Sequence, residues 1–118
     1  MPTFRQGDVV RVPFPYTDRD TRQQRPALVV SRGGLGDGSS LLWVVMITSA
    51  ANRRWPGDIS LAGGYKAVGL PIPSVVRSTK IATIEARYAA RIGRLSESLW
   101  AKVVSALRRH LGLEDRRS

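Results

Sequence analysis

The sequence has 118 residues, no cysteine and a single histidine. A chain of this length forms one domain, and we expect residues 1–113 to form it, with 114–118 as a frayed tail. The absence of cysteine excludes disulfides and thiolate metal sites, and one histidine without clustered partners predicts neither a metal site nor a cofactor. No apolar run approaches the roughly 20 residues of a membrane span, and the start has no signal-peptide hydrophobic segment, so we expect a cytoplasmic protein without membrane contact.

Positive charge is the most pronounced feature of the composition. Nineteen Lys and Arg residues against nine Asp and Glu residues give a net charge of +10, and 16 of the cations are arginine. Arginine binds phosphate through paired hydrogen bonds and stacks on flat rings. A small, arginine-rich basic domain therefore indicates first a nucleic-acid partner. The alternatives are a charge that serves solubility alone and a charge that meets an acidic protein partner.

The first two-thirds of the chain carry strand signals. Apolar, β-branched runs predict strands at residues 7–14, 27–31, 41–48, 58–61, 74–76 and 80–84. Polar or glycine-rich stretches predict loops at residues 16–24, 33–40 and 50–57. Trp43 and Trp100 lie in apolar patterns, and we expect both in the core.

One amphipathic helix is predicted at the end of the chain. Ser96 is a good N-cap, Glu97 is favourable in the first turn, and Gly112 is a candidate C-cap. Apolar residues recur between them at helical spacing, namely Leu99, Val103, Val104, Leu107 and Leu111. Many short strands followed by one helix predict a mainly β (α+β) fold, a small and strongly bent sheet or barrel with the helix packed on it.

Familiar catalytic signatures are missing from the sequence. It has no phosphate-binding glycine loop with a lysine, no nucleophile elbow and no metal motif. His110 lies near the end of the helix, so we expect a surface residue favoured by the helix dipole, far from the loops, rather than a catalyst. From the residues alone, Arg25 is interpreted as a surface cation and Thr48 as a β-branched strand residue.

Several segments in order along the chain resemble the MazF/PemK toxins. They are residues 7–10, 12–18, 25–31, 47–49, 69–70 with 74–76, 80–84 and 92–96, followed by the terminal helix. Each segment alone is weak, but the ordered set covers nearly the whole chain. The resemblance implies an SH3-like small barrel of the CcdB/PemK/MazF plasmid-maintenance toxin fold with a C-terminal α-helix. It also implies a homodimer in which two copies line one groove.

The resemblance further implies a sequence-specific, metal-independent endoribonuclease. The family cleaves single-stranded RNA, usually mRNA, to 2′,3′-cyclic phosphate and 5′-OH ends, and a cognate acidic antitoxin (MazE-like) neutralises it. Attack by the ribose 2′-OH needs proton transfer and cations that hold the phosphate. The family's catalytic arginine and threonine match Arg25 and Thr48. Arg25 would stabilise charge on the phosphate, since a guanidinium holds its proton too strongly to be a good base, and Thr48 would bind the phosphate or orient the 2′-OH.

Candidate RNA-binding residues lie mainly in the loops, because single-stranded RNA is recognised by ring stacking and by hydrogen bonds to base edges. Tyr16 and Trp55 are candidate stacking platforms, with packing as the alternative for both. The candidate phosphate or base contacts are Thr17, Asp18, Arg22, Ser49, Arg53, Arg54, Ser74, Arg77 and Lys80. The chain departs from the family pattern at Gln24 and at residues 79–81, so its recognition sequence cannot be carried over.

Three other functions stay open. A CcdB-like gyrase-inhibiting toxin would need a gyrase-contacting helix end and not the pair Arg25 and Thr48, and the Arg-Pro-Ala-Leu-Val segment at residues 25–29 argues against it. A non-catalytic SH3-like RNA-binding module fits the charge equally well, and only cleavage separates it from a nuclease. An interaction protein would use its basic face for an acidic partner. The arginines at positions 87, 91 and 94 form either a solvated face or a dimer or partner contact.

Overall fold

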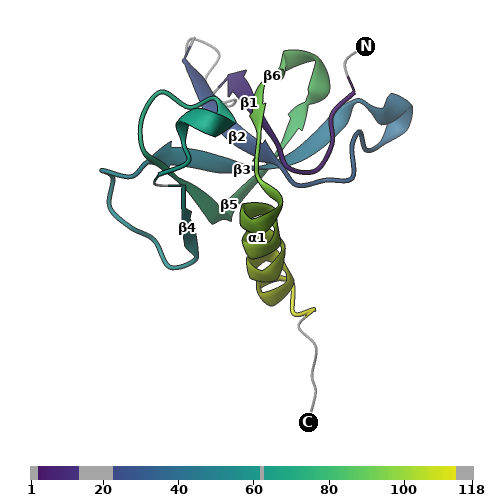
Figure 1. The fold of residues 1–118 in the computed structure, drawn as a ribbon. Helices are drawn as coiled ribbons and strands as arrows, with labels where there is room; N and C mark the ends of the chain where they lie inside the picture. Colours follow the sequence, from purple (N-terminus) through teal and green to yellow (C-terminus); the bar gives the residue numbers. More distant parts are fainter. Residues whose placement is uncertain (1–2, 14–22, 62, 114–118) are drawn as a thin grey trace.

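The computed structural model describes residues 3–13, 23–61 and 63–113, which form a single six-stranded sheet and one α-helix (Figure 1). The elements are β1 (Asp8–Pro13), β2 (Gln24–Val29), β3 (Leu41–Ser49), β4 (Asp58–Ser60), β5 (Ser74–Glu85), β6 (Ala90–Arg94) and α1 (Glu97–His110). The strand order is β4-β5-β3-β2-β1-β6, and every neighbouring pair is antiparallel. The mainly β fold with a C-terminal helix is therefore confirmed.

Both faces of the sheet are apolar because its central strands serve two cores. In β3, Val44 and Met46 enter one core, while Val45 and Ile47 enter the other, and all four are at most 3% exposed. Burial on both faces explains why residues 44–47 form a continuous apolar run instead of alternating with polar residues. The second core also receives Val103 of α1, which is fully buried.

The helix begins and ends where the sequence predicts. The Ser96 hydroxyl caps the N-terminus by accepting a hydrogen bond from the Leu99 N–H at 3.3 Å. Gly112, at φ 72°, lies one position beyond the C-cap, and the following Leu113 N–H donates to the Arg108 carbonyl at 2.7 Å. This pairing satisfies a carbonyl that the helix itself leaves open. In the described ranges, no helix is long and apolar enough to cross a membrane.

The two strands predicted at residues 74–76 and 80–84 are one strand, β5. Its pairing with β3 shifts between Val45, which lies opposite Ile81, and Met46, which lies opposite Arg77. Residues 78–80 form a bulge at this shift, so the polar residues there interrupt the apolar pattern without ending the strand. β2 begins at Gln24, earlier than predicted, and β6 was not predicted as a strand.

The expectation for Trp43 is wrong, because its residue surface is 50% exposed. Trp43 lies near the start of β3, where the second core has ended, and it lines an open apolar groove with Leu107 and Leu111 of the helix end. Trp100 is half-buried and packs against the second core, as expected.

Close backbone contact brings the two edges of the sheet together. The strands β4 and β6 are not paired with each other in the described residues, but the 3-10 turn Lys66–Val68 and Gly69 lie against β6. A Cβ at Gly69 would collide with the Ile92 carbonyl oxygen, and one at Gly93 would collide with the Val68 carbonyl oxygen. Only glycine permits this approach, which bends the sheet towards the predicted barrel.

Candidate functional site

Strand pairing brings Arg25 and Thr48 together from segments 23 residues apart. The strands β2 and β3 pair with Ala27 opposite Met46 and Leu28 opposite Val45. Continuing this antiparallel register places Arg25 opposite Thr48. Both residues line a groove of about 340 Å³ and an adjoining pocket of about 40 Å³. The proximity of these two side chains, predicted from the resemblance, is thus present in the fold.

The groove lies where β2 starts and β3 ends. Its walls come from the start of β2, the end of β3, the loop after β3 and the segment leading into β5. The lining residues are Gln23, Gln24, Arg25, Pro26, Ile47, Thr48, Ser49, Asn52, Leu70, Pro71, Ile72 and Ser74. The adjoining pocket, which Arg25 and Thr48 also line, adds the cationic residues Arg77 and Lys80 of β5. Such an arrangement suits a phosphate group.

The Arg25 side chain is exposed at the groove mouth. Its guanidinium donates a hydrogen bond to the Gln23 Oε1 at 3.3 Å. The Cα of Arg25 faces Val12 of β1, so its backbone is fixed within the sheet although its side chain reaches the surface. A rigid strand therefore presents a permanently charged donor to any ligand in the groove.

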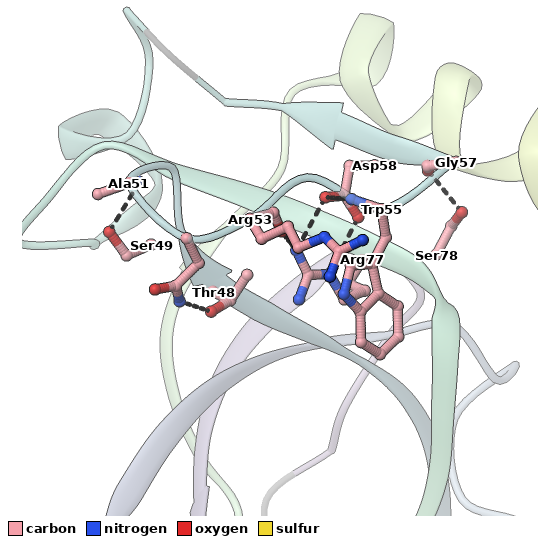
Figure 2. Close-up of polar contacts among 10 residues, drawn as sticks. Thr48, Ser49, Ala51, Arg53, Trp55, Gly57, Asp58, Arg77 and Ser78 are labelled. Atoms are coloured by element: carbon pink, nitrogen blue, oxygen red, sulfur yellow. Dashed lines mark hydrogen bonds and ion pairs between the residues drawn. The ribbon is translucent and has the colours of Figure 1, made fainter.

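Thr48 is half-buried, and its hydroxyl oxygen is held by a neighbouring amide (Figure 2). The Asn52 Nδ2 donates to the Thr48 Oγ1 at 2.6 Å. Asn52 is itself fixed by a turn, because its N–H donates to the Ser49 carbonyl at 3.0 Å and the Ala51 N–H donates to the Ser49 Oγ at 3.1 Å. With its oxygen used as an acceptor, Thr48 can donate its own proton to a ligand. Asn52 carries no sequence signal of a site residue, only the preference of asparagine for turns.

A buried ion pair supports the loop that follows β3. The Arg77 Nε donates to the Asp58 Oδ1 at 3.1 Å, and its NH2 group donates to the Asp58 Oδ2 at 3.0 Å. The two side chains are only 9% and 1% exposed. The Arg77 NH2 group also donates to the Arg53 carbonyl at 2.7 Å, and the guanidinium lies over the Trp55 ring, 4.2 Å from its centroid (Figure 2).

The Asp58 carboxylate is stabilised in its charged form. Burial raises the pKa of Asp58, but hydrogen bonds from Arg77 and from the Trp55 N–H, with the positive charges of Arg77 and Arg54, outweigh it. The net pKa therefore lies below the ordinary value of 3.8. Asp58, which the sequence did not indicate as a site residue, is the anion that allows Arg77 to be buried with its charge.

The remaining candidates occupy different environments. Trp55 is 40% exposed, and the Lys80 Nζ lies 6.0 Å from its ring centroid. Ser74 is 2% exposed and its hydroxyl donates to the Ile72 carbonyl at 2.9 Å. Arg53 and Arg54 are exposed on the loop after β3. The candidates Tyr16, Thr17, Asp18 and Arg22 lie outside the described residues.

His110 is exposed at the helix end, as expected, but it is not far from the loops. Its Nε2 lies 3.0 Å from the Ser78 Oγ in the bulge of β5, and its ring lies beside Gly57. Because the Ser78 hydroxyl donates to the Gly57 carbonyl at 2.7 Å, the histidine nitrogen is the donor to Ser78. His110 lines neither the groove nor the adjoining pocket.

The arginines at positions 87, 91 and 94 make different contacts. Arg94 NH1 and Arg91 Nε approach the buried Asp8 carboxylate, at 2.8 and 3.5 Å from its oxygens. These two arginines therefore hold β6 beside β1. Arg87 lies in the 3-10 turn Ala86–Tyr88 and pairs with the exposed Glu85.

Comparison with known proteins gives a consistent picture. Residues 5–111 match the profile of a family described as PemK-like, MazF-like toxin of type II toxin-antitoxin system. No curated protein matches in the corresponding sequence comparison.

Among solved structures, the fold is similar to MazE-MazF of Deinococcus radiodurans, with a TM-score of 0.75, 22% identity, and coverage of 97% of this chain and 100% of that one. It is also similar to an endoribonuclease in complex with its cognate antitoxin from Mycobacterial species, with a TM-score of 0.72, 20% identity, and coverage of 98% and 99%. The Mycobacterium tuberculosis toxin MazF-mt6 matches with a TM-score of 0.61, 20% identity, and coverage of 90% and 98%.

Proposed function

The chain belongs to the PemK-like, MazF-like toxin family of type II toxin-antitoxin systems, and we propose from this that it is a sequence-specific endoribonuclease. The substrate is single-stranded RNA, above all mRNA, and the products carry 2′,3′-cyclic phosphate and 5′-OH ends. The observation that carries the proposal is the meeting of Arg25 and Thr48 in one cation-lined groove. RNA-cutting neighbours of the same fold agree with this assignment.

Arg25 binds the scissile phosphate and offsets the charge that grows as the 2′-OH attacks. Its backbone is fixed at the start of β2, and its exposed side chain can reach a phosphate on which charge develops. Thr48 donates its hydroxyl proton to a phosphate oxygen, while Asn52 holds the hydroxyl oxygen from the opposite side. Ser49 and Ser74 line the same groove.

The basic surface suits two macromolecular partners. A net charge of +10 attracts the RNA backbone, and binding should weaken with salt by a slope of about −0.7 per neutralised phosphate on a single strand. The same charge suits an acidic antitoxin, and MazE-MazF complexes are among the structures of similar fold. We infer that a cognate MazE-like antitoxin neutralises the toxin in the cytoplasm by covering this surface.

The homodimer requires a surface on which two copies with the same charge can meet. A groove of about 550 Å³ is lined by Val30, Trp43, Ser78, Thr79, Ile81, Leu107, His110 and Leu111. This set contains no Lys, Arg, Asp or Glu, and Trp43, Ile81 and Leu111 are 50–70% exposed. Apolar patches of this kind often mark protein interfaces. For a strongly basic chain, this surface permits self-association with little charge repulsion.

The dimer surface is tested by Ile81→Asp. We expect the variant to be monomeric in light scattering, because two buried carboxylates would face an apolar surface. The exposed change Arg32→Asp, outside the groove, alters charge by two units and should leave the dimer intact. A dimeric Ile81→Asp protein would place the interface elsewhere.

The nuclease assignment is tested with the purified protein, a long unstructured RNA and EDTA. We expect discrete cuts at one short motif, fragments with 5′-OH ends, and no dependence on added magnesium. Intact RNA at saturating protein would overturn the assignment and favour a binding module. Cleavage that EDTA abolishes and magnesium restores would overturn the metal-independent mechanism alone.

A further inference from the structure

Trp55 is an exposed aromatic residue that is connected to the pocket of Arg25 and Thr48, because its stacked partner Arg77 lines that pocket. The Arg77 guanidinium occupies one face of the indole at 4.2 Å. Trp55 nevertheless remains 40% exposed. Because Arg77 covers one side of the indole, a flat ligand that stacks on Trp55 would use the part of the residue that remains exposed.

The ring is held in place before any ligand arrives. Asp58 accepts a hydrogen bond from the Trp55 N–H at 3.0 Å and fixes the backbone, while the guanidinium of Arg77 supports the ring. Arg77 is in turn held by both Asp58 oxygens and by its bond to the Arg53 carbonyl. A ring that is already ordered loses little conformational entropy on binding.

The position of the ring relates it to the RNA substrate. Arg77 and Lys80 extend from the pocket that holds Arg25 and Thr48, and both lie over Trp55, with the Lys80 Nζ at 6.0 Å from the ring centroid. If an RNA bound with its phosphate at Arg25, a neighbouring nucleotide of the same strand would thus lie near the indole. Stacking of successive bases on aromatic rings, with cations along the backbone, is how single-stranded RNA is bound.

We propose that Trp55 forms a base-stacking subsite for a nucleotide flanking the cleaved bond, and that Arg77 and Asp58 are positioning residues that hold it. The inference rests on the proposed endoribonuclease function. It changes the role expected for Arg77, which supports the platform instead of contacting a phosphate or a base. Stacking tolerates any base, so this subsite contributes affinity and the choice among bases comes from other contacts.

The test is an abasic scan of binding. A short unstructured oligoribonucleotide that spans the cut carries a 2′-deoxyribose at the attacking position, so that it binds without cleavage, and single bases are removed in turn. With the wild-type protein, loss of one base should weaken binding about 5- to 150-fold. Trp55→Ala should weaken binding of the intact oligonucleotide by the same factor and show no further loss at that abasic position. Trp55→Phe should restore part of the effect.

Two outcomes separate failure of this inference from failure of the nuclease assignment. If wild type and Trp55→Ala lose the same affinity at every abasic position, the stacking subsite is wrong even when cleavage proceeds normally. If the protein binds RNA without cutting a cleavable RNA, the nuclease assignment fails, and the scan on any bound oligonucleotide still decides the role of Trp55.

Arg77→Lys tests the positioning role with the charge retained. Lysine cannot bind both Asp58 oxygens in the planar geometry that also supports the ring. We expect a raised KM with kcat nearly unchanged, and a reduced loss at the abasic position that Trp55 recognises. Circular dichroism and thermal unfolding confirm that the variant is folded. An unchanged abasic profile in a folded Arg77→Lys protein would overturn the positioning role.

Discussion

The part of the chain that the structure describes contains two arrangements of a carboxylate, an arginine and an aromatic ring, and one of the two adjoins the groove. Asp58, Arg77 and Trp55 form the buried trio, in which the guanidinium lies 4.2 Å from the ring centroid. Glu85, Arg87 and Tyr88 form the exposed trio, with a ring distance of 4.8 Å and an ion pair of 2.9 Å. They lie near opposite ends of β5, since Arg77 faces Met46 and Glu85 faces Leu41 in β3.

Burial and loop contacts separate the two trios. The ion-pair side chains are 9% and 1% exposed in the buried trio but 65% and 48% exposed in the exposed trio. The buried trio also bonds to the backbone of the loop after β3, through the Arg53 carbonyl and the Trp55 N–H. The same kind of arginine–carboxylate ion pair can therefore hold a loop in place where water is excluded. Where water competes for the charges, it contributes little to stability.

The largest effect should come from the groove that the buried trio borders. Arg25→Ala and Thr48→Ala should each lower kcat by at least about 10²–10³-fold, since each removes a donor to the developing charge. Fragment yield over time on a mapped RNA gives the rates, and thermal unfolding and light scattering verify fold and dimer. Glu85→Gln serves as the control and should cut at the wild-type rate. Full activity in either alanine variant would remove that residue from the catalytic assignment.

The next largest effect concerns how much each of the two ion pairs contributes to the free energy of unfolding. Asp58→Asn leaves Arg77 buried without its anion and should lower the free energy of unfolding by about 3–5 kcal/mol. Glu85→Gln, the matched change in the exposed trio, should lower it by less than about 1 kcal/mol. Urea unfolding measures both. Equal losses would mean that burial does not distinguish the trios.

A smaller effect on cleavage is expected when the Trp55 ring is removed. Trp55→Ala should lower kcat/KM about 5- to 150-fold, mainly through KM, because it removes the stacking surface. Tyr88→Ala removes an exposed ring that also lies beside an arginine, and it should leave both constants unchanged. Initial rates over a range of RNA concentrations measure the two constants. Comparable losses in the two variants would indicate a general effect of exposed aromatics and would contradict a specific platform.

The buried trio could be predicted from the sequence only in part. Trp55 and Arg77 were recognised as candidates, but no local pattern connects Asp58 with Arg77, which is 19 residues away and reached through the pairing of β4 with β5. Arg77 was therefore interpreted as an RNA contact, although its guanidinium is engaged with protein groups. The Asn52–Thr48 bond was missed because it depends on the turn at the end of β3.

The fold was more accessible to prediction than the site. Continuous apolar runs and the capped helix reflect local spacing, so β3 and α1 were found closely. Strand β6 contains a glycine and two arginines in five residues, and its pairing with β1 depends on their bonds to the distant Asp8. Trp43 was misplaced because an apolar neighbourhood in sequence does not show where a core ends.

The smallest effect concerns the acid range, where the buried trio should respond through Asp58. Burial raises the pKa of Asp58, but the bonds from Arg77 and the Trp55 N–H bring it below 3.8, so the folded protein holds this carboxylate charged more strongly than the unfolded chain does. Its stabilisation is therefore complete well above pH 3.8 and is lost as the pH falls below 3.8 through the lowered pKa.

Urea unfolding at several pH values measures this contribution as a difference in slope. The wild-type free energy of unfolding should fall more steeply with acid below about pH 4 than that of Asp58→Asn, because the variant lacks the titrating group. Glu85→Gln, which keeps the Asp58–Arg77 pair, is measured beside it as the control for removing an exposed carboxylate. If Asp58→Asn loses stability as steeply as the wild type, the acid response comes from other carboxylates, and the buried ion pair does not control it.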